Sequence, residues 1–205
     1  MNSGLVSKKI GLYLILILNL MMLAPASAVP REIILIRHAD KLNQSDPGPF
    51  LSPRGVARAD LFSKYYLSAY REPDFIITTA QTHYSYRELQ TVIPLVTRIS
   101  ILHPQGSRPV LLSDRYKHEK KLRGLKKLSD DLLNDNRFSG KTILICWHHA
   151  EIPQLLNALG ATPYQPQLAD EDYDTVYHIL FDTHKGAVKL IILSNQYPVT
   201  ELSIN

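Results

Sequence analysis

Two pairs of chemically active residues each follow an apolar run. Arg37-His38 follows the run IILI, and His148-His149 follows the run TILICW. Continuous apolar runs of this length, rich in β-branched residues, predict strands that are buried on both faces. Because ligands bind at the carboxyl ends of the strands in open parallel sheets, both pairs fall where a site would form. If the two strands are neighbours, His38 lies close to one of the later histidines.

Three more charged residues fall near the same edge. Arg87 stands at the start of the helix expected after the second strand, and Lys41 and Glu151 follow the two histidine segments closely. A neutral imidazole is a good nucleophile toward phosphorus and a competent leaving group afterwards. Arginine forks match phosphate oxygens in a bidentate way and stay charged. The set predicts phosphoryl transfer, in which catalysis consists mostly of positioning and charge stabilisation.

Strands and helices must alternate to place these residues on one edge. The apolar patterns predict strands at 33–36, 74–79, 98–102, 142–147, 174–182 and 187–194, and helices at 53–70, 86–96, 114–136 and 152–159. Ser52 followed by Pro53 is typical of a helix start. Alternation through residue 160 and a final hairpin predict an α/β three-layer sandwich with a mostly parallel central sheet and an antiparallel edge.

Four short motifs, in the same order along the chain, resemble those of the histidine phosphatase superfamily, which contains phosphoglycerate mutase-like and acid phosphatase-like enzymes. They lie at the predicted ends of strands and helices, and together they span roughly residues 33–160. They are Arg37-His38-Ala39, Leu51 to Ala59 (LSPRGVARA), Arg87 to Thr91 (RELQT) and Ile143 to Leu159 (ILICWHHAEIPQLLNAL). The resemblance implies a phosphoglycerate mutase-like fold and a hydrolase of phosphomonoesters.

The resemblance also implies the role of each matching residue. His38 would be the nucleophile that forms a phosphohistidine. Arg37, Arg87 and one of the later histidines would hold the phosphoryl oxygens. Lys41 stands where some phytase-like members carry a second arginine, and a lysine there supplies charge but no bidentate fork. No cofactor and no metal would be needed.

The later histidine pair leaves two alternatives. His149-Ala150-Glu151 resembles the His-Ala-Glu tripeptide of some inositol-phosphate phosphatases, which makes His149 the favoured phosphate ligand and Glu151 the proton donor. If Ile152 is aligned instead with the hydrophobic residue four positions after the histidine in simpler members, His148 is selected.

Other acids and alternative functions were also weighed. Asp40 and Glu119 are the rival proton donors. A mutase is disfavoured, because Asp40 differs from the glutamate of the mutase-type motif and no mutase-type acid segment follows Arg87. Ala39 stands where the family carries glycine, and loop 80–86 departs from the usual Ser-Ser-Pro pattern. These departures motivate an alternative, an inactive relative that binds a phosphorylated ligand or a protein partner.

Metal and nucleotide sites are not expected. His148 and His149 could share an ion, but no carboxylate-rich set accompanies them and no other histidine has metal-ligand spacing. Glycine-rich nucleotide loops are absent. The single cysteine, Cys146, lies within an apolar run and predicts a small buried residue.

The first 28 residues resemble a cleavable secretory signal peptide. Lys8 and Lys9 precede an apolar stretch at 10–23, and Ala26-Ser27-Ala28 fits the cleavage rule. The apolar stretch is short for a membrane span, although an uncleaved anchor is the alternative. We expect a secreted or periplasmic single domain at 29–205, without stable membrane insertion after cleavage. The formal net charge of +4 gives no strong case for nucleic acid as a partner, which leaves a small phosphorylated substrate. The sequence does not specify an oligomeric state.

Overall fold

A six-stranded sheet forms the middle of the molecule. The computed structural model describes residues 29–42, 48–106, 109–112, 115–117, 123–161, 169–182 and 188–200, so the expected signal peptide lies outside the described residues. The strand order is β3-β2-β4-β1-β5-β6. The strands are β1 (Glu32–Arg37), β2 (Phe75–Thr78), β3 (Val110–Leu111), β4 (Thr142–Trp147), β5 (Val176–Phe181) and β6 (Val188–Leu193). The first four are parallel to one another, and β5 is antiparallel to both β1 and β6.

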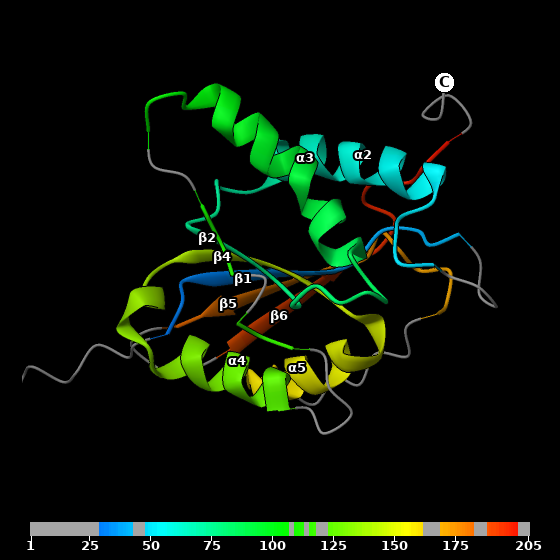
Figure 1. Cartoon of the computed structure of the whole chain (residues 1–205). Helices are drawn as coiled ribbons and strands as arrows, with labels where there is room; N and C mark the ends of the chain where they lie inside the picture. The colour runs from blue at the N-terminus through cyan, green and yellow to red at the C-terminus, as the bar shows by residue number, and fades with distance from the viewer. Residues whose placement is uncertain are drawn as a thin grey trace, which may run out of the picture.

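Helices cover both faces of the sheet, as Figure 1 shows. On one face lie α2 (Pro53–Ala69) and α3 (Arg87–Leu102), and on the other lie α4 (Arg123–Asn134) and α5 (Ile152–Ala158). Side chains of β1 alternate between the two cores: Ile34 and Ile36 face α2 and α3, while Ile33 and Leu35 face α4 and α5. The predicted α/β three-layer sandwich with an antiparallel edge is confirmed. Within the described part of the chain, none of the helices is long and apolar enough to cross a bilayer.

The two histidine-bearing strands are direct neighbours, as expected. β1 and β4 pair in parallel with Arg37 opposite Trp147, and every residue of both strands is buried. The backbone N–H of His38 continues the ladder by donating to the Trp147 carbonyl oxygen at 3.3 Å. His38 and His148 therefore leave the sheet side by side at the same edge.

The start of α2 is held tightly against the segment that follows β1. The Ser52 side chain caps the helix by accepting from the Gly55 N–H at 3.0 Å, with Pro53 at the first helical position. A Cβ atom at residue 55 would overlap the Asp40 carbonyl oxygen. Only glycine permits this approach, so the helix start fixes the course of the chain directly after His38.

The predicted strand at 98–102 is wrong, because α3 continues through this segment to Leu102. Pro94 lies inside the helix, and the alternating pattern of RISIL imitates a strand. Val92, Leu95 and Ile99 are buried with helical spacing, whereas Ile93 is 42% exposed. The third strand is instead the short β3, which pairs with β2.

The helix predicted at 114–136 begins later in the structure than expected. Residues 115–117 form a turn in which Tyr116 is fully buried, and α4 begins at Arg123. Tyr116 accepts from the Ala80 N–H through its carbonyl oxygen and donates to Asp131 through its hydroxyl, at 2.6 and 2.9 Å. This tertiary anchor overrides the helical pattern. Leu125, Leu128 and Leu132 are buried and form the apolar face of α4.

Candidate active site

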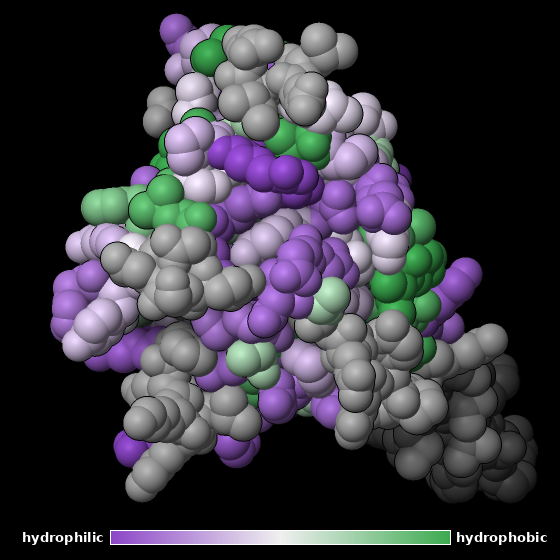
Figure 2. Space-filling model, turned by 90° about the vertical axis from the view of Figure 1, so that its right-hand side faces the viewer, coloured by the Kyte–Doolittle hydropathy of each residue, from purple (hydrophilic) through white to green (hydrophobic). Residues whose placement is uncertain are grey.

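The candidate residues meet at the carboxyl edge of β1 and β4. Figure 2 faces this side of the molecule and shows hydrophilic side chains gathered in its middle, with hydrophobic ones toward its flanks. Two strands, the first turn of α3 and the segment before β5 all deliver residues to this edge. The charged set predicted from the sequence therefore occupies one place in the fold.

His38 is held as a neutral imidazole. Its ring is 1% exposed, and Nδ1 lies 2.8 Å from the Ala39 carbonyl oxygen. A carbonyl only accepts, so Nδ1 carries the proton and Nε2 keeps its lone pair. Burial lowers the pKa of His38 to about 3, and the positive charges of Arg37 and Arg87 act in the same direction. The imidazole is thus neutral over the whole physiological pH range.

Arg37 presents half of its guanidinium to the site. Nη1 donates to the carbonyl oxygens of Ala169, Asp170 and Asp172 at 3.3, 2.9 and 3.1 Å. The guanidinium carbon lies 4.0 Å from the centre of the Tyr173 ring, a cation–π contact. Nε and Nη2 are buried, and neither has a hydrogen-bond partner among the described residues. Burial lowers the pKa of Arg37, but an arginine keeps its charge.

Arg87 is the first residue of α3 and is 7% exposed. Its Nη1 donates to the Gly48 carbonyl oxygen, which ties the loop before α2 to the site. Its Nε is buried, and the described part of the chain offers it no partner. A second guanidinium group therefore lies near His38, and its Nε–H has no acceptor among the described residues.

The two later histidines differ in how they are held. His148 caps the 3₁₀ turn η2 (His149–Glu151), and its Nδ1 accepts from the Ala150 N–H at 3.3 Å. The Nδ1 atom of His149 is buried and has no hydrogen-bond partner among the described residues. Its Nε2 atom lies 3.7 Å from Asp170 Oδ1. Burial and the charge of Arg37 lower the pKa of His149 to about 4.

Both later histidines reach His38. The rings of His38 and His148 are 6.1 Å apart, and one nitrogen from each of the three histidines lies within 4.8 Å of the others. Three imidazoles could hold a divalent ion such as zinc. However, Arg37 and Arg87 lie close enough to repel positive charge from His38 and His149. This surrounding charge suits an anion better than a cation.

Lys41 adds a third positive charge to this group. Its backbone forms an isolated bridge with Leu51, and its side chain is partly buried. Burial lowers the pKa of Lys41, and repulsion from Arg37 and Arg87 lowers it further. The lysine therefore lies within electrostatic reach of both guanidinium groups, as predicted.

Two of the predicted proton donors already have partners within the protein. Glu151 is 3% exposed, and its Oε2 accepts from the Trp147 indole N–H at 2.8 Å. Asp40 forms ion pairs with Arg58 at 2.5 Å and with Arg54 at 3.2 Å. Glu119 lies outside the described residues. The role of Glu151 stays a prediction.

A pocket of about 280 Å³ opens beside His148. Its lining comes from loop 80–86 and the first turn of α3, and comprises Thr79, Ala80, Thr82, Tyr84, Ser85, Arg87, Glu88 and His148. Glu88 was not among the residues expected at this edge. Its position directly after Arg87, at a helix start expected on the carboxyl edge, could have identified it as a candidate. The pocket adds an acid and several hydroxyl groups to the site.

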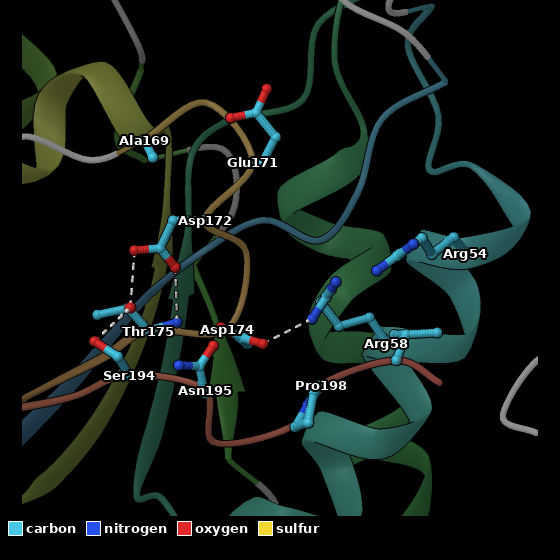
Figure 3. Close-up of a pocket in the computed structure, with 11 residues that line it drawn as sticks. Arg54, Arg58, Ala169, Glu171, Asp172, Asp174, Thr175, Ser194, Asn195 and Pro198 are labelled. Atoms are coloured by element: carbon cyan, nitrogen blue, oxygen red, sulfur yellow. Dashed lines mark hydrogen bonds and ion pairs between the residues drawn. The ribbon is translucent and has the colours of Figure 1, made fainter. Parts of the chain in front are cut away.

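A second hollow, of about 500 Å³, lies between the start of α2, the segment before β5 and the C-terminal segment (Figure 3). Two contacts within its lining join these segments: Arg58 pairs with Asp174 at 3.2 Å, and the Thr175 hydroxyl donates to Asp172 at 2.8 Å. Ala169 and Asp172 belong both to its wall and to the segment that holds Arg37. The segment that holds Arg37 therefore also forms part of the wall of this hollow.

No protein-family model and no curated protein matches the sequence. Solved structures do match. A phosphoserine phosphatase from Entamoeba histolytica, in complex with 3-phosphoglyceric acid, is 16% identical, with a TM-score of 0.54 over 81% of this chain and 98% of that one. The chain has the fold of this phosphatase. A histidine-to-alanine mutant from the same organism, in complex with phosphoserine, is 15% identical, with a TM-score of 0.53 over 80% and 97%. A protein of Escherichia coli K-12 described as an alpha-ribazole-5'-P phosphatase is 12% identical, with a TM-score of 0.53 over 82% and 99%. The phosphoglycerate mutase-like fold predicted from the motifs is thereby confirmed.

Proposed function

We propose that the chain is a histidine-type phosphatase that hydrolyses phosphomonoesters through a phosphohistidine on His38. One observation carries the proposal. Around a neutral, buried imidazole, the structure gathers buried nitrogen atoms of Arg37, Arg87 and His149 that the described residues leave without partners. Buried polar groups are normally hydrogen-bonded, so such a set favours a ligand that supplies acceptor oxygens. A phosphoryl group has the matching charge and geometry.

The geometry supports a two-step displacement. His38 Nε2 attacks phosphorus, while Arg37, Arg87 and His149 hold the non-bridging oxygens, on which negative charge is spread during transfer. The leaving alcohol departs from the side opposite Nε2. Water then attacks the phosphohistidine and releases inorganic phosphate. Because the donors are fixed in a buried place, they need little reorganisation during the reaction.

The reaction would not need a metal ion. The positive charges of Arg37, Arg87 and Lys41 provide the stabilisation that magnesium supplies in other phosphoryl-transfer sites. Activity should therefore persist with a chelator. The small pocket beside His148 and the small ligands of the Entamoeba histolytica structures favour a small phosphorylated substrate over a nucleic acid.

Export completes the proposal and rests on the sequence alone. Residues 1–28 resemble a cleavable signal peptide. Expression of the full chain in a bacterium, followed by cell fractionation and N-terminal sequencing, should yield a mature chain that starts at Val29. A protein that keeps Met1 in the cytosolic fraction would contradict export but not the phosphatase activity.

The central test is an assay of the mature chain on 4-nitrophenyl phosphate with chelator present. Turnover is expected, and acid-labile phosphate should be trapped on His38 by rapid quenching. The variant His38→Ala should lose both. Full activity of this variant would overturn the mechanism. Phosphate binding without turnover or labelling would indicate instead a non-catalytic binding protein, for which Ala39 and loop 80–86 are the motivating departures.

A further inference from the structure

The proposed reaction requires a proton for the leaving oxygen, and the structure offers one carboxyl group beside the pocket. Glu151, the acid that the motif suggests, is engaged by the Trp147 indole. Asp40 is paired with two arginines. Glu88 instead lines the pocket in which Arg87 and His148 also take part. An alkoxide is a poor leaving group, so the position of an acid in this pocket bears directly on catalysis.

Glu88 is positioned by the same element that positions a phosphate ligand. It follows Arg87 on the first turn of α3, which packs on the sheet through Val92 and Leu95. Its side chain is 3% exposed, and the Ser85 hydroxyl donates to Oε2 at 2.8 Å. Among the described residues one hydroxyl group orients the Glu88 carboxyl group, whereas Asp40 faces two guanidinium groups. Glu88 can therefore exchange a proton with a group that enters the pocket.

We propose that Glu88 is the proton donor to the leaving-group oxygen and that the pocket lined by Thr79, Thr82, Tyr84 and Ser85 receives the leaving group. The inference rests on the proposed function. It assigns to loop 80–86, which departs from the usual motif, the task of binding the alcohol part of the substrate. It also explains why an acid stands directly beside the arginine of the RELQT segment.

The step balances as follows. The Nε2 lone pair of His38 forms the N–P bond while the P–O bond to the leaving group breaks. The electron pair of that bond stays on oxygen, which takes the proton from the Glu88 carboxyl group and leaves as the alcohol. In the second step the Glu88 carboxylate accepts a proton from water as the water oxygen bonds to phosphorus. The N–P bond breaks, its electron pair returns to His38, and phosphate leaves.

The test compares three phosphate esters of similar size with the variant Glu88→Gln. Nitrophenolate leaves readily without a proton, phenolate less readily, and benzyl alkoxide hardly at all. Loss of a general acid should lower kcat/KM by about 10²–10⁴-fold on benzyl phosphate and by less than about 10-fold on 4-nitrophenyl phosphate. With 4-nitrophenyl phosphate the variant should also accumulate phosphohistidine, because the base of the second step is missing.

Two matched variants make the result specific. Glu151→Gln is the same change at the rival acid, and its effect should be equal on all three esters. Glu72→Gln changes an exposed acid that pairs with His103, and activity should be unchanged. Circular dichroism and thermal unfolding confirm that each variant folds, and Glu88→Asp, which keeps the acid, should restore part of the lost rate on benzyl phosphate.

The outcomes separate the inference from the function on which it rests. Parallel losses on all three esters in Glu88→Gln would overturn the proton donor while leaving the phosphatase intact. The same holds if the leaving-group dependence appears in Glu151→Gln or His148→Gln instead. A wild-type protein that hydrolyses none of the esters and is never labelled on His38 would overturn the function and the donor together.

Discussion

The Thr91 hydroxyl joins the nucleophile segment to the helix that carries Arg87. It accepts from the Ala39 N–H at 2.9 Å and donates to the Arg87 carbonyl oxygen at 2.7 Å. The residue after His38 and the first residue of α3 are therefore fixed through one buried oxygen. The spacing between His38 Nε2 and the Arg87 guanidinium depends on this link.

Replacing Thr91 with valine should separate positioning from charge. The variant Thr91→Val keeps the shape but leaves the Ala39 N–H unpaired, which costs about 1–3 kcal/mol of stability. Displacement of reacting groups by about 1 Å can cost on the order of 10²-fold in rate, so kcat should fall by about 10–100-fold on 4-nitrophenyl phosphate. Thr97→Val, at an exposed position of the same helix, is the control. Equal activity of the two variants would show that the link does not position the site.

The buried histidines should make the protein sensitive to acid. The pKa of His38 is about 3 in the folded chain and about 6.5 when unfolded, so the unfolded state binds more protons between these values. Stability is therefore present above pH 6.5 and is lost as the pH falls toward 3. The free energy of unfolding in urea should decrease between pH 7 and pH 4.

The slope of that decrease identifies its source. The variant His38→Gln removes one titrating group and should show a shallower loss, while His83→Gln, at an exposed loop position, should keep the slope of the wild type. Identical slopes for all three proteins would mean that His38 is not held neutral by burial.

The chemistry of the site was readable because strand ends are marked in the sequence. The run 142–147 was predicted as a strand with the bounds of β4, and Ser52-Pro53 marked the start of α2. Short uninterrupted apolar runs rich in β-branched residues favour buried strands, so their ends locate Arg37 and the histidine pair. That β1 and β4 are parallel neighbours was only a condition at the level of the sequence, and the structure supplies it.

What failed depended on contacts between distant segments. Pro94 and the alternating pattern of 98–102 gave α3 a false end, because the sequence does not show that Leu95 and Ile99 face the same core. The helix expected from residue 114 does not begin there, because Tyr116 is hydrogen-bonded to Ala80 and Asp131. Side-chain direction was equally hidden: Glu151 turns to the Trp147 indole, and Glu88 borders the pocket. The spacing of residues in the sequence can place an acid at the edge of the sheet, but it does not show which group its carboxylate contacts.

Gly55 should be intolerant of even one methyl group. In the variant Gly55→Ala, the new Cβ would meet the Asp40 carbonyl oxygen, so α2 or the segment after His38 must move. Overpacking of this kind costs typically about 1–3 kcal/mol, and the midpoint of urea unfolding should fall accordingly. Activity should fall as well, because Asp40 lies two residues after His38. Ser68→Ala, at an exposed position near the end of α2, is the control and should change neither property. A fully stable and active Gly55→Ala protein would show that this contact is not needed.

The two arginines should bind oxyanions through their forks rather than through charge alone. Vanadate or phosphate should raise the melting temperature, since a ligand at 100 times its Kd stabilises the folded state by about 2.7 kcal/mol. A lysine keeps the positive charge but offers no planar pair of donors. Hydrogen bonds to charged groups contribute about 1.5–3 kcal/mol, so Arg37→Lys and Arg87→Lys should each weaken vanadate binding by about 10–100-fold. Arg71→Lys, at an exposed position, should bind as the wild type does. Calorimetric titration gives the four dissociation constants, including that of the wild type, directly. Unchanged affinity in both site variants would reject the oxyanion pocket, because the Nε and Nη2 atoms that the described residues leave unpaired would then play no part in binding.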